Sequence, residues 1–232
     1  MKNNDFDDVI SYYKSEEVNH LLVQFLNQVE TFFTTNPKLK NDKIIHSIKS
    51  RQKDPEHLRD KLIRKQEKGQ IITKASLFSE ITDLNGIRLL HLYPQQFSSI
   101  HTEIMKKIKE LEDWTLVECP KAYTWDPETA EAYKKLNIIP EIKDSYYTSV
   151  HYVVKPNNDK SVISCEIQVR TLFEEIWGEI DHTINYPYET DSLACKEQIR
   201  VLAKLVSTGT RLADSIFKTL DEHKSMGAVL NS

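Results

Sequence analysis

Glycine is scarce in this chain of 232 residues, which contains only five, all far apart. A Walker loop needs two glycines five residues apart followed by lysine, and a dinucleotide-binding turn needs three closely spaced glycines; the sequence has neither. The HExxH zinc helix and the GxSxG nucleophile turn are also absent. Any phosphate chemistry here must therefore use side chains and a metal instead of a glycine-rich cradle.

Cysteines and long apolar runs are equally sparse. Cys119, Cys165 and Cys195 lie far apart, which excludes a CxxC motif and disfavours a disulfide framework. No apolar run approaches the roughly 18–20 residues of a membrane helix. The acidic start, MKNNDFDDVI, lacks the apolar region of a signal peptide. We therefore expect a cytoplasmic protein that does not enter a membrane.

The charge is unevenly distributed. The whole chain carries −4, with a pI of about 6.1, which argues against a surface that coats nucleic acid throughout. Residues 38–74, however, contain twelve Lys or Arg against five Asp or Glu, a net of +7, so the remainder carries −11. This basic segment fits either a bound polyanion or a solvated, charged helix.

Hydrophobic periodicity indicates one large domain with helical additions. It predicts helices over residues 8–34, 54–67, 95–111, 171–185 and 193–220. It predicts strands over 44–50, 85–93, 114–119, 148–155 and 162–170, and a long polar connection over 120–146 with a short helix at 127–136. This order is typical of an α/β or α+β fold with a mixed sheet.

The two last helices carry apolar stripes. In helix 171–185, we expect Phe173, Ile176, Trp177 and Ile180 to face the core, and Glu175 and Glu179 to face solvent. In helix 193–220, a stripe is formed by Ile199, Leu202, Leu205, Leu212, Ile216 and Leu220, with Gly209 on the same side for close packing.

Two neighbouring strands place polar side chains on one face each. Alternation puts Glu166, Gln168 and Arg170 on one side of their strand. The preceding strand aligns Tyr147 with His151 in the same way. These faces line one site if the strands form a hairpin, and otherwise they form a solvated outer surface.

A second group of charged residues precedes the buried strand at 85–93. Arg51 and Lys53 lie just before a helix that carries Lys61 and Arg64, a spacing that lets four cations converge on a triphosphate. Asp83 sits at the strand edge, where a carboxylate is either a metal ligand or a turn residue. Cations beside carboxylates are the general layout for magnesium-assisted phosphoryl transfer.

Four segments, in order, carry a resemblance: IKSRQKDPEHLRDKLIRK, DLNGIRLLHLY, YYTSVHYVV and EIQVRTLFEEIWGEIDH. Together they resemble the synthetase domain of the RelA/SpoT family, in the form of the single-domain small alarmone synthetases. The resemblance implies a nucleotidyltransferase-like mixed sheet flanked by helices. It places an N-terminal helix in residues 1–37, the synthetase core in 38–190 and a C-terminal helix in 191–232, and it suggests a homo-oligomer formed through the terminal helices.

The resemblance also implies an activity. Such enzymes transfer the β,γ-pyrophosphate of ATP to the ribose 3′-hydroxyl of GDP or GTP with Mg²⁺, and they serve the stringent response. It implies that Asp83 and Glu166 are catalytic and bind the metal, with Glu166 as general base. The implied ATP-binding residues are Arg51, Lys53, Lys61, Arg64 and Arg88. The implied acceptor-binding residues are Tyr147, His151, Gln168, Arg170, Lys143, His182 and Asn185, with Tyr147 stacked on the base.

Three departures from the family pattern fall near the substrate sites. The sequence Tyr146-Tyr147-Thr148-Ser149 stands where the family often has Gly-Tyr-Arg-Ser, His57 replaces a small hydroxyl residue, and the connection before Tyr147 is long. They leave open a toxic relative that modifies adenosine nucleotides or the 3′ end of tRNA, with an antitoxin partner. A catalytically silent RNA- or nucleotide-binding regulator is a third hypothesis. No histidine–aspartate hydrolase motif is seen, so we expect synthesis without degradation.

Overall fold

A mixed β-sheet forms the centre of the computed structural model, which describes residues 3–158, 161–186 and 188–230. Its seven described strands are β1 (Ser47–Gln52), β2 (Asn85–His91), β3 (Trp114–Leu116), β4 (Lys121–Thr124), β5 (Pro140–Ile142), β6 (Ser149–Pro156) and β7 (Cys165–Thr171). The order is β1-β2-β7-β6-β4-β5, with β3 also pairing with β6. Because β2–β7 and β4–β5 are parallel and the other pairs are antiparallel, the predicted mixed sheet is confirmed.

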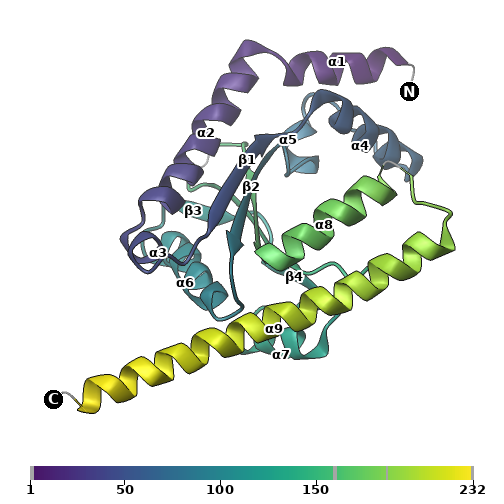
Figure 1. Cartoon of the computed structure of the whole chain (residues 1–232). Helices are drawn as coiled ribbons and strands as arrows, with labels where there is room; N and C mark the ends of the chain where they lie inside the picture. The colour runs from purple at the N-terminus through teal and green to yellow at the C-terminus, as the bar shows by residue number, and fades with distance from the viewer. Residues whose placement is uncertain (1–2, 159–160, 187, 231–232) are drawn as a thin grey trace.

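Helices surround this sheet (Figure 1). They are α1 (Asn3–Tyr13), α2 (Glu16–Thr35), α3 (Pro37–Asn41), α4 (Pro55–Glu67), α5 (Leu77–Glu80), α6 (Gln96–Lys109), α7 (Pro127–Lys135), α8 (Leu172–Asn185) and α9 (Leu193–Leu230). The long α9 runs past α8 and α7, and its C-terminal end projects beyond the rest of the molecule (Figure 1). Within the described residues, none of these helices combines the length and apolar character needed to cross a membrane.

The N-terminal region differs from the single helix expected over residues 8–34. Two helices are present, and α2 begins at Glu16 after the N-cap Ser15, whose hydroxyl accepts a hydrogen bond from the backbone N–H of Val18 at 3.4 Å. A serine N-cap satisfies one of the free N–H groups of the first turn, so it favours a new helix start over continuation. The capping residue was present in the sequence but its effect was not anticipated.

The polar connection over residues 120–146 also contains more structure than predicted. Its helix is confirmed as α7, capped by Asp126, whose carboxylate accepts hydrogen bonds from the N–H groups of Glu128 and Thr129. The strands β4 and β5 on either side of α7 were missed, and they extend the sheet beyond β6. Strands of three or four residues are too short to show a clear alternation.

The main core lies between the sheet and the helices on one of its faces. Ile87 and Leu89 of β2 and Ile167 of β7 are fully buried, and they belong to the same cluster as Leu22 and Val29 of α2. The alternate residues of the same strands therefore face the opposite side. That opposite face is polar, as the alternation in strand 162–170 predicted.

The packing of α8 and α9 corrects the expected apolar faces. Only Trp177 of the predicted α8 core face is buried, with 3% exposure, whereas Phe173, Ile176 and Ile180 are exposed. In α9, Ile199 is buried and Leu202 packs at the edge of the cluster around Trp177, but Leu205, Leu212, Ile216 and Leu220 are exposed. Two shared contacts set this orientation: the indole N–H of Trp177 donates to the Ile199 carbonyl at 3.2 Å, and Gly209 leaves room for the Phe173 ring.

Candidate active site

A cleft of about 590 Å³ lies on the polar face of the sheet, with α8 as one wall. Strands β1, β2 and β7 supply its floor, because the residues opposite the main core point into it. Of the predicted site residues, the cleft is lined by Arg51, Asp83, Arg88, Tyr147, Glu166, Gln168, Arg170, His182 and Asn185. Residues that are far apart in the sequence are therefore brought to one place.

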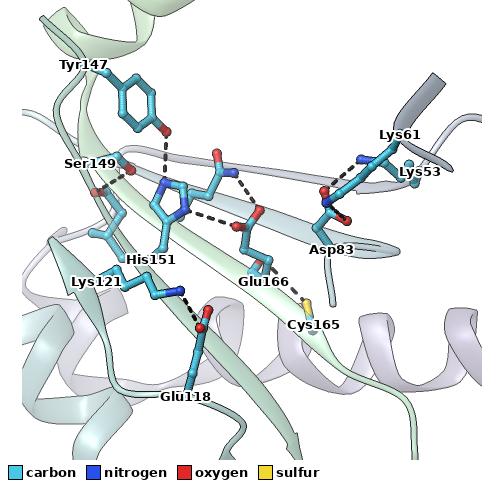
Figure 2. A network of polar contacts seen from close by, with 12 residues as sticks. Lys53, Lys61, Asp83, Glu118, Lys121, Tyr147, Ser149, His151, Cys165 and Glu166 are labelled. Carbon is cyan, nitrogen blue, oxygen red and sulfur yellow. Dashed lines mark hydrogen bonds and ion pairs between the residues drawn. The ribbon is translucent and has the colours of Figure 1, made fainter. Parts of the chain in front are cut away.

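Asp83 precedes β2 and is held by two lysines. Lys53 Nζ donates to Asp83 Oδ2 at 2.8 Å, and Lys61 Nζ donates to Oδ1 at 2.8 Å (Figure 2). Burial alone acts to raise the pKa of Asp83, but the two ammonium groups outweigh it and hold the pKa below its usual value. Asp83 is thus an ionised carboxylate at neutral pH, with a cation on each oxygen.

Glu166 of β7 is held by the side chains of a histidine and a glutamine. His151 lies on β6, paired directly with Gln168 of β7, which confirms the expected hairpin. His151 Nδ1 contacts Glu166 Oε1 at 3.0 Å, and Gln168 Nε2 donates to Oε2 at 2.8 Å (Figure 2). Tyr147 Oη lies 2.9 Å from His151 Nε2. Because a carboxylate only accepts, the pattern assigns the proton to Nδ1, so that Tyr147 donates to Nε2.

The same network acts on the protonation of Glu166. Burial raises the pKa of Glu166, and the charge of Asp83 raises it to a smaller extent. The contacts with His151 and Gln168 act in the opposite direction and together outweigh these two effects. The net result is a pKa below the ordinary value for glutamate. The charge of Asp83 acts on Glu166 because the two carboxylates line the same cleft. Figure 2 shows Glu166 between His151 and Asp83.

Asp83 and Glu166 are the two carboxylates of the cleft that could hold a divalent cation such as Mg²⁺. Mg²⁺ prefers oxygen ligands and is usually held by one or two carboxylates, with waters and substrate phosphates completing its shell. Within the described ranges, no group of three or more His, Cys, Asp or Glu side chains forms a closed metal cage. Asp83 and Glu166 are each about one-fifth exposed, so both are accessible from the cleft.

The remaining predicted ATP residues take different positions. Arg51 lies on β1, opposite Gly86 of β2, and lines the cleft. Arg88 donates to Glu175 at 3.2 Å and also pairs with Glu179. Arg64 is exposed on α4, donates to the Asp60 carbonyl at 3.3 Å and is not part of the cleft lining. Lys53 and Lys61 reach the site through Asp83.

The Tyr147 side chain has one more neighbour than the sequence indicated. The Tyr123 ring, from the missed strand β4, lies 6.1 Å from the Tyr147 ring and 4.9 Å from the His151 ring, edge-on to the latter. Lys143 lies over the Tyr123 ring at 4.6 Å and pairs with Glu141, so it is outside the cleft lining. Burial raises the pKa of Tyr147, which keeps its hydroxyl protonated and able to donate.

Tyr146 stands where the family often has glycine, and its backbone adopts a conformation that favours glycine. Tyr146 adopts a φ of +65°, in the left-handed region that favours glycine. Its ring packs edge-on against Trp125 at 5.1 Å and belongs to the cluster around Trp177. Aromatic packing therefore accompanies a backbone conformation that costs a tyrosine roughly 1–2 kcal/mol.

Four residues line the cleft at the C-terminal end of α8 and just after it. His182 stacks on Tyr186 with ring centroids 4.6 Å apart, and Asn185 donates to Asp181 at 2.8 Å. Tyr186 also contacts the His57 ring edge-on at 5.4 Å. The departure noted at His57 thus lies beside this end of the cleft.

Two cleft features escaped the sequence interpretation. Lys49 lines the cleft from β1, although residues 44–50 were predicted only as a strand. Glu175, expected to face solvent, is buried with 3% exposure and pairs with Lys49, Arg88 and Arg170. The charge of Arg88 and Arg170 on the polar strand faces was the available indication that an acid must lie nearby.

Comparison with known proteins gives the class. Residues 50–191, more than half of the chain, match the family described as the region found in RelA/SpoT proteins. The chain belongs to the RelA/SpoT family. The sequence is 29% identical over 147 residues to GTP pyrophosphokinase YwaC of Bacillus subtilis (strain 168), which covers 63% of this chain and 61% of that protein. The match thus spans less than two-thirds of the relative's length.

Solved structures support the same fold. A GTP pyrophosphokinase family protein from Streptococcus pneumoniae aligns with a TM-score of 0.68 at 21% identity, covering 91% of this chain and 96% of that one. Small alarmone synthetase 1 from Bacillus subtilis aligns with a TM-score of 0.65 at 20% identity, covering 90% and 100%. That synthetase has also been crystallised bound to its product pppGpp and bound to AMPCPP.

Proposed function

We propose that this protein is an ATP:nucleotide 3′-pyrophosphokinase that forms (p)ppGpp from GDP or GTP. The observation that carries the proposal is the pairing of Asp83 and Glu166 in one cleft, between two lysines on one side and a His–Tyr pair on the other. Ionised carboxylates beside cations are the equipment of metal-assisted phosphoryl transfer. The family match and the relatives named as GTP pyrophosphokinases support the same conclusion.

In this proposal, Asp83 and Glu166 would hold Mg²⁺, which when bound offsets the charge of the triphosphate. Glu166 accepts the proton of the acceptor 3′-hydroxyl, whose oxygen attacks the β-phosphorus as the bond to the α-phosphate oxygen breaks and AMP leaves. The depressed pKa of Glu166 keeps it ionised for that role, and His151 fixes its orientation. Lys53, Lys61, Arg51 and Arg64 bind ATP, with Arg88 at its phosphates.

The acceptor side is assigned to the residues around Tyr147. Its ring lines the cleft and stacks on the acceptor base, whereas Gln168, Arg170, His182 and Asn185 contact the rest of the nucleotide. Lys143 reaches the same side from the loop after β5. The proposal makes the protein a synthetase without hydrolase activity, located in the cytoplasm, where its cysteines stay free.

A different acceptor is the second candidate function. The strand β4, in the long connection before Tyr147, supplies Tyr123, which touches both Tyr147 and His151, and Tyr146 stands where glycine was expected. These departures beside Tyr147 favour a changed acceptor, such as an adenosine nucleotide or the 3′ end of tRNA. An antitoxin partner would accompany such a toxic activity.

One assay separates these candidates. Purified protein is incubated with Mg²⁺, ATP labelled in its β and γ phosphates, and each of GDP, GTP, ADP and tRNA. Label transferred to GDP or GTP supports the main proposal, and label in ADP or tRNA supports the second. No labelled product with any acceptor, at any Mg²⁺ concentration, contradicts both and leaves a silent nucleotide- or RNA-binding regulator.

We further propose that the protein forms a homo-oligomer through its terminal helices. Leu205, Leu212 and Ile216 of α9 are each more than half exposed, on the helix that projects from the molecule (Figure 1). Exposed apolar stripes of this kind mark association surfaces. Light scattering of the full chain measures its mass, and a monomer at micromolar concentration contradicts this part of the proposal.

A further inference from the structure

A single carboxylate lies behind three cations of the cleft. Glu175, on α8, is only 4% exposed at its side chain. Its Oε1 accepts hydrogen bonds from Lys49 Nζ at 2.8 Å and from Arg88 Nη1 at 3.2 Å, and its Oε2 forms an ion pair with Arg170 Nη2. The three cations come from β1, β2 and β7, so one acid joins three neighbouring strands to the helix that covers them.

The cations face the cleft, whereas Glu175 does not. Lys49, Arg88 and Arg170 belong to the cleft lining, and Glu175 lies behind them. Glu179, about half exposed at the rim, is the second acid on Arg88. Three positive charges against these two negative ones leave a net of +1, so the cluster retains an excess of positive charge for an anionic ligand.

Arg170 is the most constrained member of the cluster. It is 5% exposed, and its buried Nε has no hydrogen-bond partner among the residues that the structure describes. A Cβ atom at position 178 would lie 2.8 Å from Arg170 Nη1, so Gly178 lets α8 pass closely over the guanidinium. The Tyr147 ring lies 5.8 Å from the guanidinium carbon. Arg170 is therefore enclosed by Glu175, Gly178 and Tyr147, and its unpaired Nε is itself buried.

We propose that Glu175 is a positioning residue that holds the guanidinium groups of Arg88 and Arg170 at the cleft, where they bind nucleotide phosphates. This inference rests on the proposed function, and it adds the acid that organises the phosphate-binding arginines. An arginine that is already oriented loses less conformational entropy when it binds a phosphate. A lone guanidinium on an open strand face would have to be ordered by the nucleotide itself.

A purely structural role makes a different prediction. Buried ion pairs contribute little net stability on average, but removal of one partner is costly because it leaves a charge unpaired. If Glu175 only stabilises the fold, its loss lowers the melting temperature and weakens all nucleotides equally. If it orients the arginines, its loss reduces the affinity gained with each added phosphate.

The experiment measures that gain directly by calorimetric titration of the full-length protein with AMP, ADP and ATP, and with GMP, GDP and GTP. For Glu175→Gln, we expect the affinity ratio between triphosphate and monophosphate to fall at least fivefold. Glu175→Asp retains the charge but shortens the reach, so it should fold normally and show a smaller fall. Unchanged ratios in Glu175→Asp and in folded Glu175→Gln overturn the inference.

Asp126→Asn is the matched control. Asp126 is also a buried carboxylate paired with an arginine, Arg211, but it lies outside the cleft lining. We expect this variant to lose stability and to keep the wild-type affinity ratios. If the Glu175 variants show the expected fall in the ratio of triphosphate to monophosphate affinity but the wild type transfers no pyrophosphate, the proposed function is refuted and the inference stands. If the wild type is active but the affinity ratios of the Glu175 variants are unchanged, the inference alone is refuted.

Discussion

The two sides of the cleft hold their carboxylates in opposite ways. Asp83 is bound by two charged ammonium groups, each on a long flexible side chain. Glu166 is bound by an imidazole and an amide that lie on paired strands, and a tyrosine hydroxyl fixes the imidazole in turn. The Asp83 side can rearrange when phosphates arrive, because a lysine ammonium on a four-carbon chain can turn its donors from Asp83 to a phosphate, whereas the Glu166 side is ordered before any ligand binds.

This difference matches the tasks proposed for the two sides. A triphosphate with its metal brings charge that must be matched by mobile cations. Proton removal from a hydroxyl needs a base at a fixed place, within hydrogen-bond reach of the acceptor. The cleft therefore combines an adaptable, charged half with a rigid, largely neutral half.

The largest effect is expected from the rigid half. Glu166→Gln keeps the size and the bond to Gln168 but removes the proposed base and one proposed metal ligand, so we expect the transfer rate to fall about a thousandfold. The rate of product formation from labelled ATP, measured with the melting temperature, checks this. Glu118→Gln, on an exposed ion pair outside the cleft, is the control. Retention of more than a tenth of the activity would contradict a base at this position.

A smaller effect is expected from the mobile half. Lys53→Met removes one cation from Asp83 and from the incoming triphosphate, so kcat/KM for ATP should fall about a hundredfold. The KM for the acceptor should remain unchanged, which steady-state kinetics with each substrate varied in turn would establish. Lys65→Met, on the same region but paired with Glu80, is the matched variant. A shift confined to the acceptor KM would reverse the assignment of the two sides.

The hydrogen bond to Glu166 can be tested separately. In His151→Phe, burial is no longer opposed by the imidazole, so the pKa of Glu166 rises and the acid limb of the pH–rate profile moves to higher pH. We expect kcat at neutral pH to fall about tenfold, toward the lower end of such effects. His101 also contacts a tyrosine hydroxyl, that of the core residue Tyr152 at 2.8 Å, whereas His151 contacts Glu166. His101→Phe should leave the acid limb in place, and an equal shift in both variants would reject a specific role for His151.

Strand alternation explains why this rigid half was predictable from the sequence. A period of two fixes which side chains share a face, so Glu166, Gln168 and His151 were grouped correctly once the two strands paired. The same reasoning failed on α8, where the apolar residues Ile176 and Ile180 indicated the wrong buried face. Three strand cations attract Glu175 inward, and that attraction depends on tertiary positions that a helical period does not contain.

Short elements were the other failure. The short strands β4 and β5 extend the sheet beyond β6, and β4 brings Tyr123 beside Tyr147, but strands of three or four residues have no recognisable period. Conversely, the loss of glycine at Tyr146 was noticed in the sequence, and its φ of +65° gives that substitution a physical consequence. A departure at a single residue was therefore easier to recognise in the sequence than the strands of the long connection over residues 120–146.

The smallest effect is expected on the free energy of unfolding. It arises at His91, a buried histidine that contrasts with His151. His91 is 3% exposed and its Nδ1 lies 3.0 Å from the Tyr93 carbonyl oxygen. Burial lowers the pKa of His91 to about 4, although the bond to Tyr93 opposes this change. The unfolded chain therefore binds more protons than the native state between pH 6.5 and 4, and the free energy of unfolding decreases as the pH falls through that range.

At pH 5, this linkage should remove about 2 kcal/mol relative to pH 7. Urea unfolding at both pH values measures the loss, and His91→Gln, which keeps a donor for the Tyr93 carbonyl, should lose most of the difference. The exposed His46, replaced by Gln, should behave like the wild type. If the wild type and His91→Gln lose equal stability between pH 7 and pH 5, the acid sensitivity does not come from His91. Because Asp83 and Glu166 both have lowered pKa values, their contribution is lost only at still lower pH, which separates the two sources.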